Sequence, residues 1–98
     1  FGPLVPILTF KKFDEVVERS NNNELGLASY IYTNDMEKAN KASELMETGT
    51  VAVNTPVVAV AEAPFGGIKQ TGYGREGGSM AIKDYLNIKY THMGIHYD

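Results

Sequence analysis

Residues 27–54 read LASYIYTNDMEKANKASELMETGTVAVN, and this stretch decides the fold. β-Branched and aromatic residues are concentrated at its beginning, Leu27–Tyr32, which predicts a strand. Its end, Thr50–Asn54, predicts another strand, because its apolar run is continuous, as in a sheet covered on both faces. The residues between them predict a helix. A strand, a helix and a strand in this order predict parallel strands joined by a right-handed crossover.

The helix between these strands has recognisable end signals. Asn34 and Glu37 have the spacing of a capping box, with Asn34 in the capping role. Gly49 is well placed to end the helix. Small and apolar residues at helical spacing form the stripe that would pack on the sheet, namely Ala39, Ala42, Ser43 and Met46.

The same alternation extends toward the N-terminus. Pro3–Phe10 predicts a short apolar strand, with its prolines confined to the entrance. A helix is predicted next, since residues at i, i+3, i+4 and i+7 share one face, namely Phe13, Val16, Val17 and Ser20. Asn21–Asn23 would end that helix, because Asn competes for backbone hydrogen bonds and tolerates turns. The predicted fold class is therefore α/β, with a β-α-β-α-β order of parallel strands.

A glycine-rich stretch follows Pro56 and runs to Gly78. An irregular connection of this length is uncommon in a small unit and is usually functional. Beyond it we expect a short helix over residues 79–86. A last strand is expected at Ile88–Met93, whose Ile, Tyr and Thr content favours strand pairing.

The composition excludes several classes of protein. The chain has 98 residues, which allows one small domain, and its net charge of −3 gives no support for a nucleic-acid-binding face. No apolar run approaches the roughly 20 residues that span a bilayer, and no secretory signal is visible. We therefore expect a cytoplasmic protein without a nucleic-acid or membrane partner. Because the sequence does not begin with Met, we also expect it to be a piece of a larger protein.

Cysteine is absent, so this chain offers no thiolate nucleophile, no disulfide and no thiolate metal site. His92 and His96 have a metal-like i, i+4 spacing. Gly94 lies between them, however, and no carboxylate partner is arranged nearby. We expect no metal site.

One glycine motif is misleading. Residues 72–77, GYGREG, match the dinucleotide-binding pattern G-x-G-x-x-G letter for letter. That pattern binds a dinucleotide only between a strand and a helix of a longer βαβ unit. The residues before Gly72 predict no strand, and too few residues follow Gly77 to complete the unit. A kinase glycine loop is excluded as well, since neither a V-A-I-K strand nor a D-F-G motif follows.

A longer match includes this motif. Residues 64–78 read PFGGIKQTGYGREGG and resemble the C-terminal signature of the aldehyde dehydrogenase superfamily, commonly P-F-G-G-x-K-x-S-G-x-G-R-E. The opening FGP resembles the end of the family's E-x-F-G-P motif, and Asn21, Val53-Asn54 and the late IKY strand fall at family spacing. The resemblance is strongest to semialdehyde-oxidising members such as succinate-semialdehyde dehydrogenases. Thr71 stands where Ser is usual and keeps the hydroxyl.

The resemblance implies the C-terminal part of an NAD- or NADP-dependent aldehyde dehydrogenase, which oxidises succinate semialdehyde or a similar semialdehyde to the acid. Residues 1–87 would belong to its catalytic domain, and residues 88–98 would form an oligomerisation strand and tail. The family's nucleophilic Cys and general-base Glu lie upstream of F-G-P, so the chain alone would be inactive. The implied partners are the aldehyde, the remainder of the dehydrogenase chain and further copies in a dimer or tetramer. The alternative is a non-catalytic interaction or oligomerisation module derived from such a segment.

The resemblance also implies roles for individual residues. Phe1 matches the Phe that packs near the nicotinamide ring of the cofactor, and Phe65 matches the Phe that lines the substrate tunnel. A place in the core is the alternative for Phe65. Ala59 and Val60 match positions where several semialdehyde-oxidising relatives have a Ser that helps bind the substrate's distal carboxylate. Here they offer only methyl groups, which donate no hydrogen bond. Glu76 matches a Glu that relays protons away from the general base. Its alternative role is to stabilise the N-terminus of the following helix.

Overall fold

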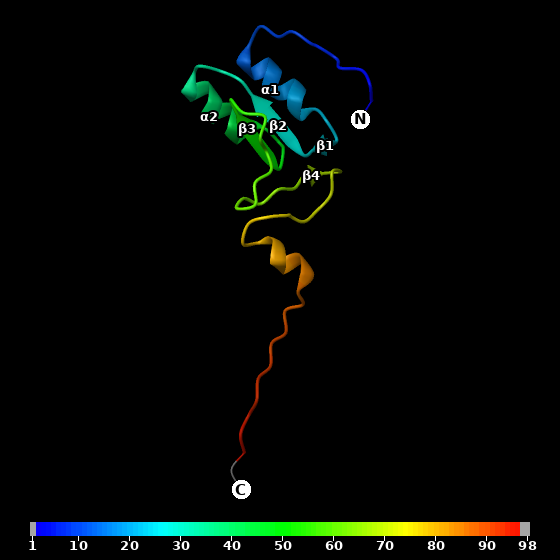
Figure 1. The fold of residues 1–98 in the computed structure, drawn as a ribbon, viewed down its shortest axis with the longest axis vertical. Helices are drawn as coiled ribbons and strands as arrows, with labels where there is room; N and C mark the ends of the chain where they lie inside the picture. Colours follow the sequence, from blue (N-terminus) through cyan, green and yellow to red (C-terminus); the bar gives the residue numbers. More distant parts are fainter. Residues whose placement is uncertain (1, 97–98) are drawn as a thin grey trace.

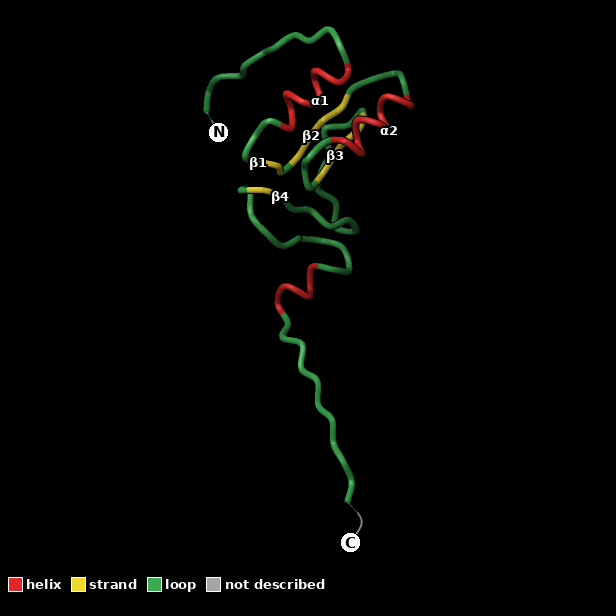
Figure 2. Tube along the Cα trace, turned by 180° about the vertical axis from the view of Figure 1, so that it is seen from behind, coloured by secondary structure: helices red, strands yellow, loops and turns green. Residues whose placement is uncertain are grey.

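The computed structural model describes residues 2–96, and its helices and strands gather toward one end of an elongated molecule (Figure 1). Along the chain they are α1 (Phe13–Asn21), β1 (Leu25–Gly26), β2 (Ala28–Ile31), α2 (Met36–Leu45), β3 (Thr50–Val53), β4 (Ile68–Lys69) and the 3₁₀ helix η1 (Ala81–Tyr85). After η1 the chain runs away from the other elements as an extended tail, and the whole measures 79 × 33 × 24 Å (Figure 2).

The predicted strand–helix–strand unit is confirmed. Strands β2 and β3 are parallel and in register from Ala28 opposite Thr50 to Ile31 opposite Val53. Helix α2 connects them and contacts both strands. The residues buried in α2 and β3 are all alanines, which let the helix approach the sheet closely: Ala39, Ala42 and Ala52.

The core is small. Within residues 2–96, Val17 of α1 joins those alanines as the buried apolar residues, and no large side chain is fully buried. Burying one large aliphatic side chain contributes about 1.5–3 kcal/mol, so four small contributors supply little. A two-stranded sheet is at best marginally stable alone. The described residues therefore bury little apolar surface, and many of their large apolar side chains are exposed.

The prediction of a first strand at Pro3–Phe10 is wrong. The segment is extended, but it forms no strand, and Leu4, Val5 and Ile7 are each more than 80% exposed. A strand requires a neighbour that completes its hydrogen-bond ladder, and no strand among the described residues lies beside this segment. The predicted β-α-β-α-β order is therefore observed only from the first helix onward.

The predicted last strand is also unpaired. Residues 88–93 are extended without ladder partners, and Ile88 is 98% exposed. A polar contact between Tyr90 Oη and His92 Nδ1, 3.2 Å long, is a local interaction within this tail. The expected helix before it is shorter than residues 79–86, and it is the 3₁₀ helix η1.

Both end signals predicted for α2 are misplaced. The capping residue is Asp35 rather than Asn34, because Asp35 Oδ1 accepts a hydrogen bond of 3.0 Å from the backbone N–H of Lys38. These adjacent residues have equivalent oxygen acceptors, so the sequence pattern alone does not choose between them. The helix ends at Leu45, before Gly49. Gly49 has a packing role instead, since a Cβ there would overlap the carbonyl oxygen of Gly66.

The glycine-rich stretch contains a strand that the sequence did not predict. The two residues of β4 pair antiparallel with β1, Leu25 opposite Lys69 and Gly26 opposite Ile68. This pairing attaches the stretch to the end of the unit opposite α2's first turn (Figures 1 and 2). A strand of this length is too short for any alternation of apolar and polar residues to be visible.

Candidate functional site

Two of the residues with implied roles are direct neighbours. Phe65 and Glu76 form an antiparallel bridge, in which the N–H of Phe65 donates to the Glu76 carbonyl at 2.7 Å. The N–H of Glu76 donates back to the Phe65 carbonyl at 2.8 Å. Side chains that are directly opposed in an antiparallel pair lie on the same face. The structure thus brings an aromatic ring and a carboxylate to one place on the glycine-rich stretch.

The loop that carries Ala59 and Val60 folds against the residues that follow this bridge. The N–H of Gly78 donates to the Ala61 carbonyl at 2.8 Å. Gly77 has φ +70°, and a Cβ on it would stand 2.7 Å from the Ala63 carbonyl oxygen. A side chain at this position would be both strained and obstructed. The close approach of the two backbones places the loop beside Phe65 and Glu76.

A groove of about 260 Å³ lies on one side of the bridge. Its lining combines apolar, aromatic and charged side chains, including Leu27, Phe65, Tyr73, Arg75, Glu76 and Asp84. Phe65 is half-buried and Glu76 is exposed, whereas Ala59 and Val60 lie outside this lining. The alternative place for Phe65 in the core is not observed. The alternative role of Glu76 at the next helix is not observed either, since η1 begins at Ala81.

Arg75 fixes the shape of the turn between these residues. Its Nη1 atom donates to the carbonyl of Gly67 at 2.9 Å and to that of Gly74 at 2.7 Å. Its backbone N–H donates to Asp84 Oδ2 at 2.9 Å, which ties the turn to η1. Because these donors are committed within the chain, Arg75 is a structural residue of the groove. No sequence pattern indicates the partner Asp84, which lies in a different element.

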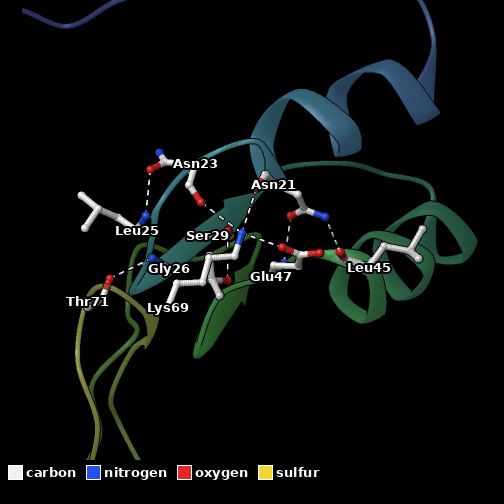
Figure 3. A network of polar contacts seen from close by, with 10 residues as sticks. Asn21, Asn23, Leu25, Gly26, Ser29, Leu45, Glu47, Lys69 and Thr71 are labelled. Atoms are coloured by element: carbon white, nitrogen blue, oxygen red, sulfur yellow. Dashed lines mark hydrogen bonds and ion pairs between the residues drawn. The ribbon is translucent and has the colours of Figure 1, made fainter.

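Lys69, inside the glycine-rich stretch, attaches that stretch to both helices (Figure 3). Its Nζ atom lies 2.5 Å from Glu47 Oε2 and donates to the backbone carbonyls of Asn21 at 2.8 Å and Asn23 at 3.1 Å. Its side chain is 25% exposed, against 56% for that of Glu47. The carbonyl of Asn21 belongs to the last turn of α1, where the helix dipole favours a cation. Lys69 therefore joins the loop to the ends of two helices.

Asn21 and Thr71 complete this network (Figure 3). Asn21 Nδ2 donates to the Leu45 carbonyl at 2.7 Å, and its Oδ1 accepts from the N–H of Glu47 at 2.9 Å, so the side chain caps the end of α2. Thr71 Oγ1 accepts from the N–H of Gly26 at 2.8 Å. This contact explains why a hydroxyl is present at position 71, where the resemblance expects Ser.

The glycine motif does not fit a dinucleotide. In such a motif the backbone N–H groups are free to donate to phosphate oxygens. Here the N–H groups of Arg75, Glu76 and Gly78 already donate to other atoms of the chain. The residue implied at the cofactor, Phe1, lies outside the described residues, as do the last two residues of the predicted tail. The cofactor contact that the resemblance implies therefore lies outside the described residues.

No group of three or more His, Cys, Asp or Glu side chains in residues 2–96 is arranged to hold a metal ion. No helix described there is long and apolar enough to cross a bilayer.

Comparison with known proteins agrees with the resemblance seen in the sequence. The model of the aldehyde dehydrogenase family matches residues 1–91. The chain is 52% identical over 94 residues to the 3-sulfolactaldehyde dehydrogenase of Pseudomonas putida, covering 96% of this chain and 19% of that protein. It is 50% identical over 90 residues to a glutarate-semialdehyde dehydrogenase of Pseudomonas putida, covering 92% and 19%.

A solved structure agrees with these relatives. The succinate-semialdehyde dehydrogenase of Burkholderia pseudomallei superimposes with a TM-score of 0.86 at 43% identity, covering 92% of this chain and 19% of that one. The chain spans about a fifth of the length of the curated relatives it matches. The predicted resemblance is confirmed, and the chain belongs to the aldehyde dehydrogenase family.

Proposed function

We propose that this chain acts as the C-terminal part of an NAD- or NADP-dependent dehydrogenase that oxidises a semialdehyde, succinate semialdehyde or one similar to it, to the carboxylic acid. Family membership supports aldehyde oxidation. The relatives described above are named for aldehydes that carry a distal acid group, which supports a substrate of that class. The observation that carries the proposal is the Phe65–Glu76 bridge, because it pairs an apolar wall with a carboxylate at one groove.

The dehydrogenase needs parts that this chain does not contain. Cysteine is absent, so the thiolate that attacks the aldehyde must come from the remainder of the enzyme. The small core and the exposed apolar side chains of both terminal segments support the same conclusion. Ile7 is 87% exposed and Met93 is 84% exposed, as expected of surfaces that a larger protein covers. In this proposal residues 1–87 belong to the catalytic domain, with Phe1 near the nicotinamide.

Each groove residue then has a chemical task. Phe65 presents an apolar wall of the substrate tunnel, against which the methylene groups of the semialdehyde pack, and the acyl intermediate forms beyond that wall. Hydrolysis of that intermediate releases a proton, and the Glu76 carboxylate accepts it and passes it toward solvent, to which it is exposed. Ala59 and Val60 line the outer part of the tunnel with methyl groups, so the charge of the substrate must be met by other parts of the enzyme.

The exposed tail supports a second role in assembly. Residues 88–93 are extended with their backbone groups unpaired in the described structure, which makes them a template for a strand of another chain. We propose that they form the oligomerisation strand of a homodimer or homotetramer. A non-catalytic interaction module would use this strand without the groove, so a kinetic effect at the groove distinguishes the two functions.

The experiment is a comparison of two Glu variants in the full-length enzyme. Glu76→Gln removes the proton acceptor and keeps the shape of the side chain. We expect kcat for succinate semialdehyde to fall about tenfold or more, with KM little changed, because relay of a proton acts after binding. Glu62→Gln is the matched control, since Glu62 is also exposed and lies in the same glycine-rich stretch. Equal kcat values for both variants would contradict the role of Glu76.

A further inference from the structure

Two residues with unusual backbone conformations bracket the loop beside the groove. Among the non-glycine residues that the structure describes, Asn54 and Lys69 are the ones with positive φ, at 55° and 56°. Such conformations are strained for residues with a Cβ and persist only where the surroundings enforce them. The segment between them, residues 55–68, carries Ala59, Val60 and Phe65.

Asn54 replaces a rung of the parallel sheet with its side chain. Its backbone N–H donates to the Ile31 carbonyl at 2.8 Å and continues the ladder between β3 and β2. The next rung of a parallel ladder would run from the Thr33 N–H to the Asn54 carbonyl. Asn54 Oδ1 accepts that N–H instead, at 2.9 Å, and Asn54 Nδ2 donates to the Thr33 carbonyl at 3.0 Å. The main chain is thereby freed to turn out of the sheet at a fixed point.

Lys69 holds the other end of the segment. Its ammonium contacts Glu47, which follows α2, and the carbonyls of Asn21 and Asn23 at the end of α1 (Figure 3). Its own backbone pairs with β1. Both ends of residues 55–68 are thus attached to the sheet and helices by side chains, and Ala59 and Val60 between them are exposed.

We propose that Asn54 and Lys69 are positioning residues of the aldehyde site. By fixing both ends of residues 55–68 they set where Ala59, Val60 and Phe65 stand relative to the substrate. This inference rests on the proposed function. The affinity for a semialdehyde long enough to reach the wall formed by Ala59, Val60 and Phe65 depends on where that wall stands, whereas a two-carbon aldehyde does not reach the wall. Asn54 and Lys69, the two clamps of this segment, therefore act on the affinity for the longer substrate rather than on the chemical step.

The test uses four variants of the full-length enzyme. Asn54→Gly removes the amide, and glycine adopts positive φ without strain. Lys69→Met keeps a long apolar stem without the ammonium. Asn22→Gly and Lys12→Met are matched controls, because both residues are exposed and lie outside the bracketed segment. The measurements are kcat and KM for succinate semialdehyde and for acetaldehyde, and the rate at which a Glu-specific protease cleaves after Glu62, in the middle of the segment.

We expect Asn54→Gly and Lys69→Met to raise KM for succinate semialdehyde about tenfold, because a displaced wall makes weaker contacts with the substrate, and tenfold corresponds to about 1.4 kcal/mol of lost binding. The kcat for acetaldehyde should stay within about twofold, and cleavage after Glu62 should be about tenfold faster, since the segment opens more often. Both controls should behave as the wild type.

Unchanged KM and unchanged cleavage in Asn54→Gly overturn the inference. So does an equal fall in kcat for both aldehydes, which would mean that the clamps support the catalytic centre as a whole. If Lys69→Met does not fold, Asn54→Gly still tests the clamp at Asn54. The proposal that Lys69 acts only on residues 55–68 is then refuted. A wild-type enzyme that oxidises neither aldehyde refutes the proposed function, while cleavage after Glu62 still tests whether the clamps hold the segment.

Discussion

Gly49→Ala should loosen the glycine-rich stretch from the sheet. A Cβ at residue 49 would overlap the carbonyl oxygen of Gly66 and stand 2.8 Å from the Gly66 carbonyl carbon and 3.0 Å from Gly67 Cα. All three atoms are backbone, so they cannot avoid the methyl group by changing a rotamer. Overpacking of this kind costs about 1–3 kcal/mol. Ala also restricts the unfolded chain more than Gly does, which stabilises the folded state by about 0.4–1 kcal/mol. A net destabilisation of about 1–2 kcal/mol remains.

Amide hydrogen exchange in the full-length enzyme measures this change locally. A destabilisation of about 1–2 kcal/mol multiplies the population of the open state about 5–30-fold, so the amides of Phe65 and Glu76 should exchange faster by that factor. Gly94→Ala is the control, because a Cβ at residue 94 meets no atom within 4 Å. Exchange in Gly49→Ala that equals exchange in Gly94→Ala would refute the close contact between the Gly49 and Gly66 backbones.

Three further outcomes are expected. Tyr90→Pro removes a backbone donor from the proposed assembly strand, so light scattering should report a smaller oligomer with the fold intact, and an unchanged mass would count against that strand. Ala59→Ser or Val60→Ser should raise the kcat/KM ratio of succinate semialdehyde to butanal, by up to about tenfold for one hydrogen bond to a charged group of about 1.5 kcal/mol, and no change in either variant would show that the loop does not face the carboxylate. The backbone N–H of Lys38, and then its ammonium, hold the pKa of Asp35 below its ordinary value of 3.8. The ionised Asp35 cap therefore stabilises α2 fully above about pH 3.8, and this stabilisation is lost as the pH falls through the lowered pKa of Asp35. The Lys38 amide signal should titrate in this acid range in the wild type and remain flat in Asp35→Asn.

The helices and the parallel strand pair were predictable because their signals are local. The apolar stripe of α2 and the β-branched residues of Thr50–Val53 lie within their own elements. The strand predicted at Pro3–Phe10 has an equally good local signal, yet it forms no ladder, because a strand is defined by a neighbour that the described chain does not supply. Residues 88–93 differ from the prediction for the same reason. The β1–β4 pair could not be predicted, since its register depends on residues far apart in sequence.

The candidate site was likewise predictable only in part. Phe65 and Glu76 could be identified from the ordered glycine motif, and their direct pairing could not, because it depends on the backbone turn between them. Lys69 stands in the same motif, but sequence does not show that its ammonium reaches the ends of two helices. The side chain of Asn54 replaces a rung of the sheet only because the main chain leaves the ladder there, which is a property of the fold.

The most direct test of the central claim is the rate of NADH or NADPH formation from succinate semialdehyde, measured for the full-length enzyme and for residues 1–98 alone. We expect a measurable rate with one of the two cofactors for the full-length enzyme. We expect no rate above a heat-killed control for residues 1–98, since they contain no cysteine to form a thiohemiacetal. No rate from the full-length enzyme with succinate semialdehyde or a similar semialdehyde, or a rate from residues 1–98 alone, would contradict the proposed function.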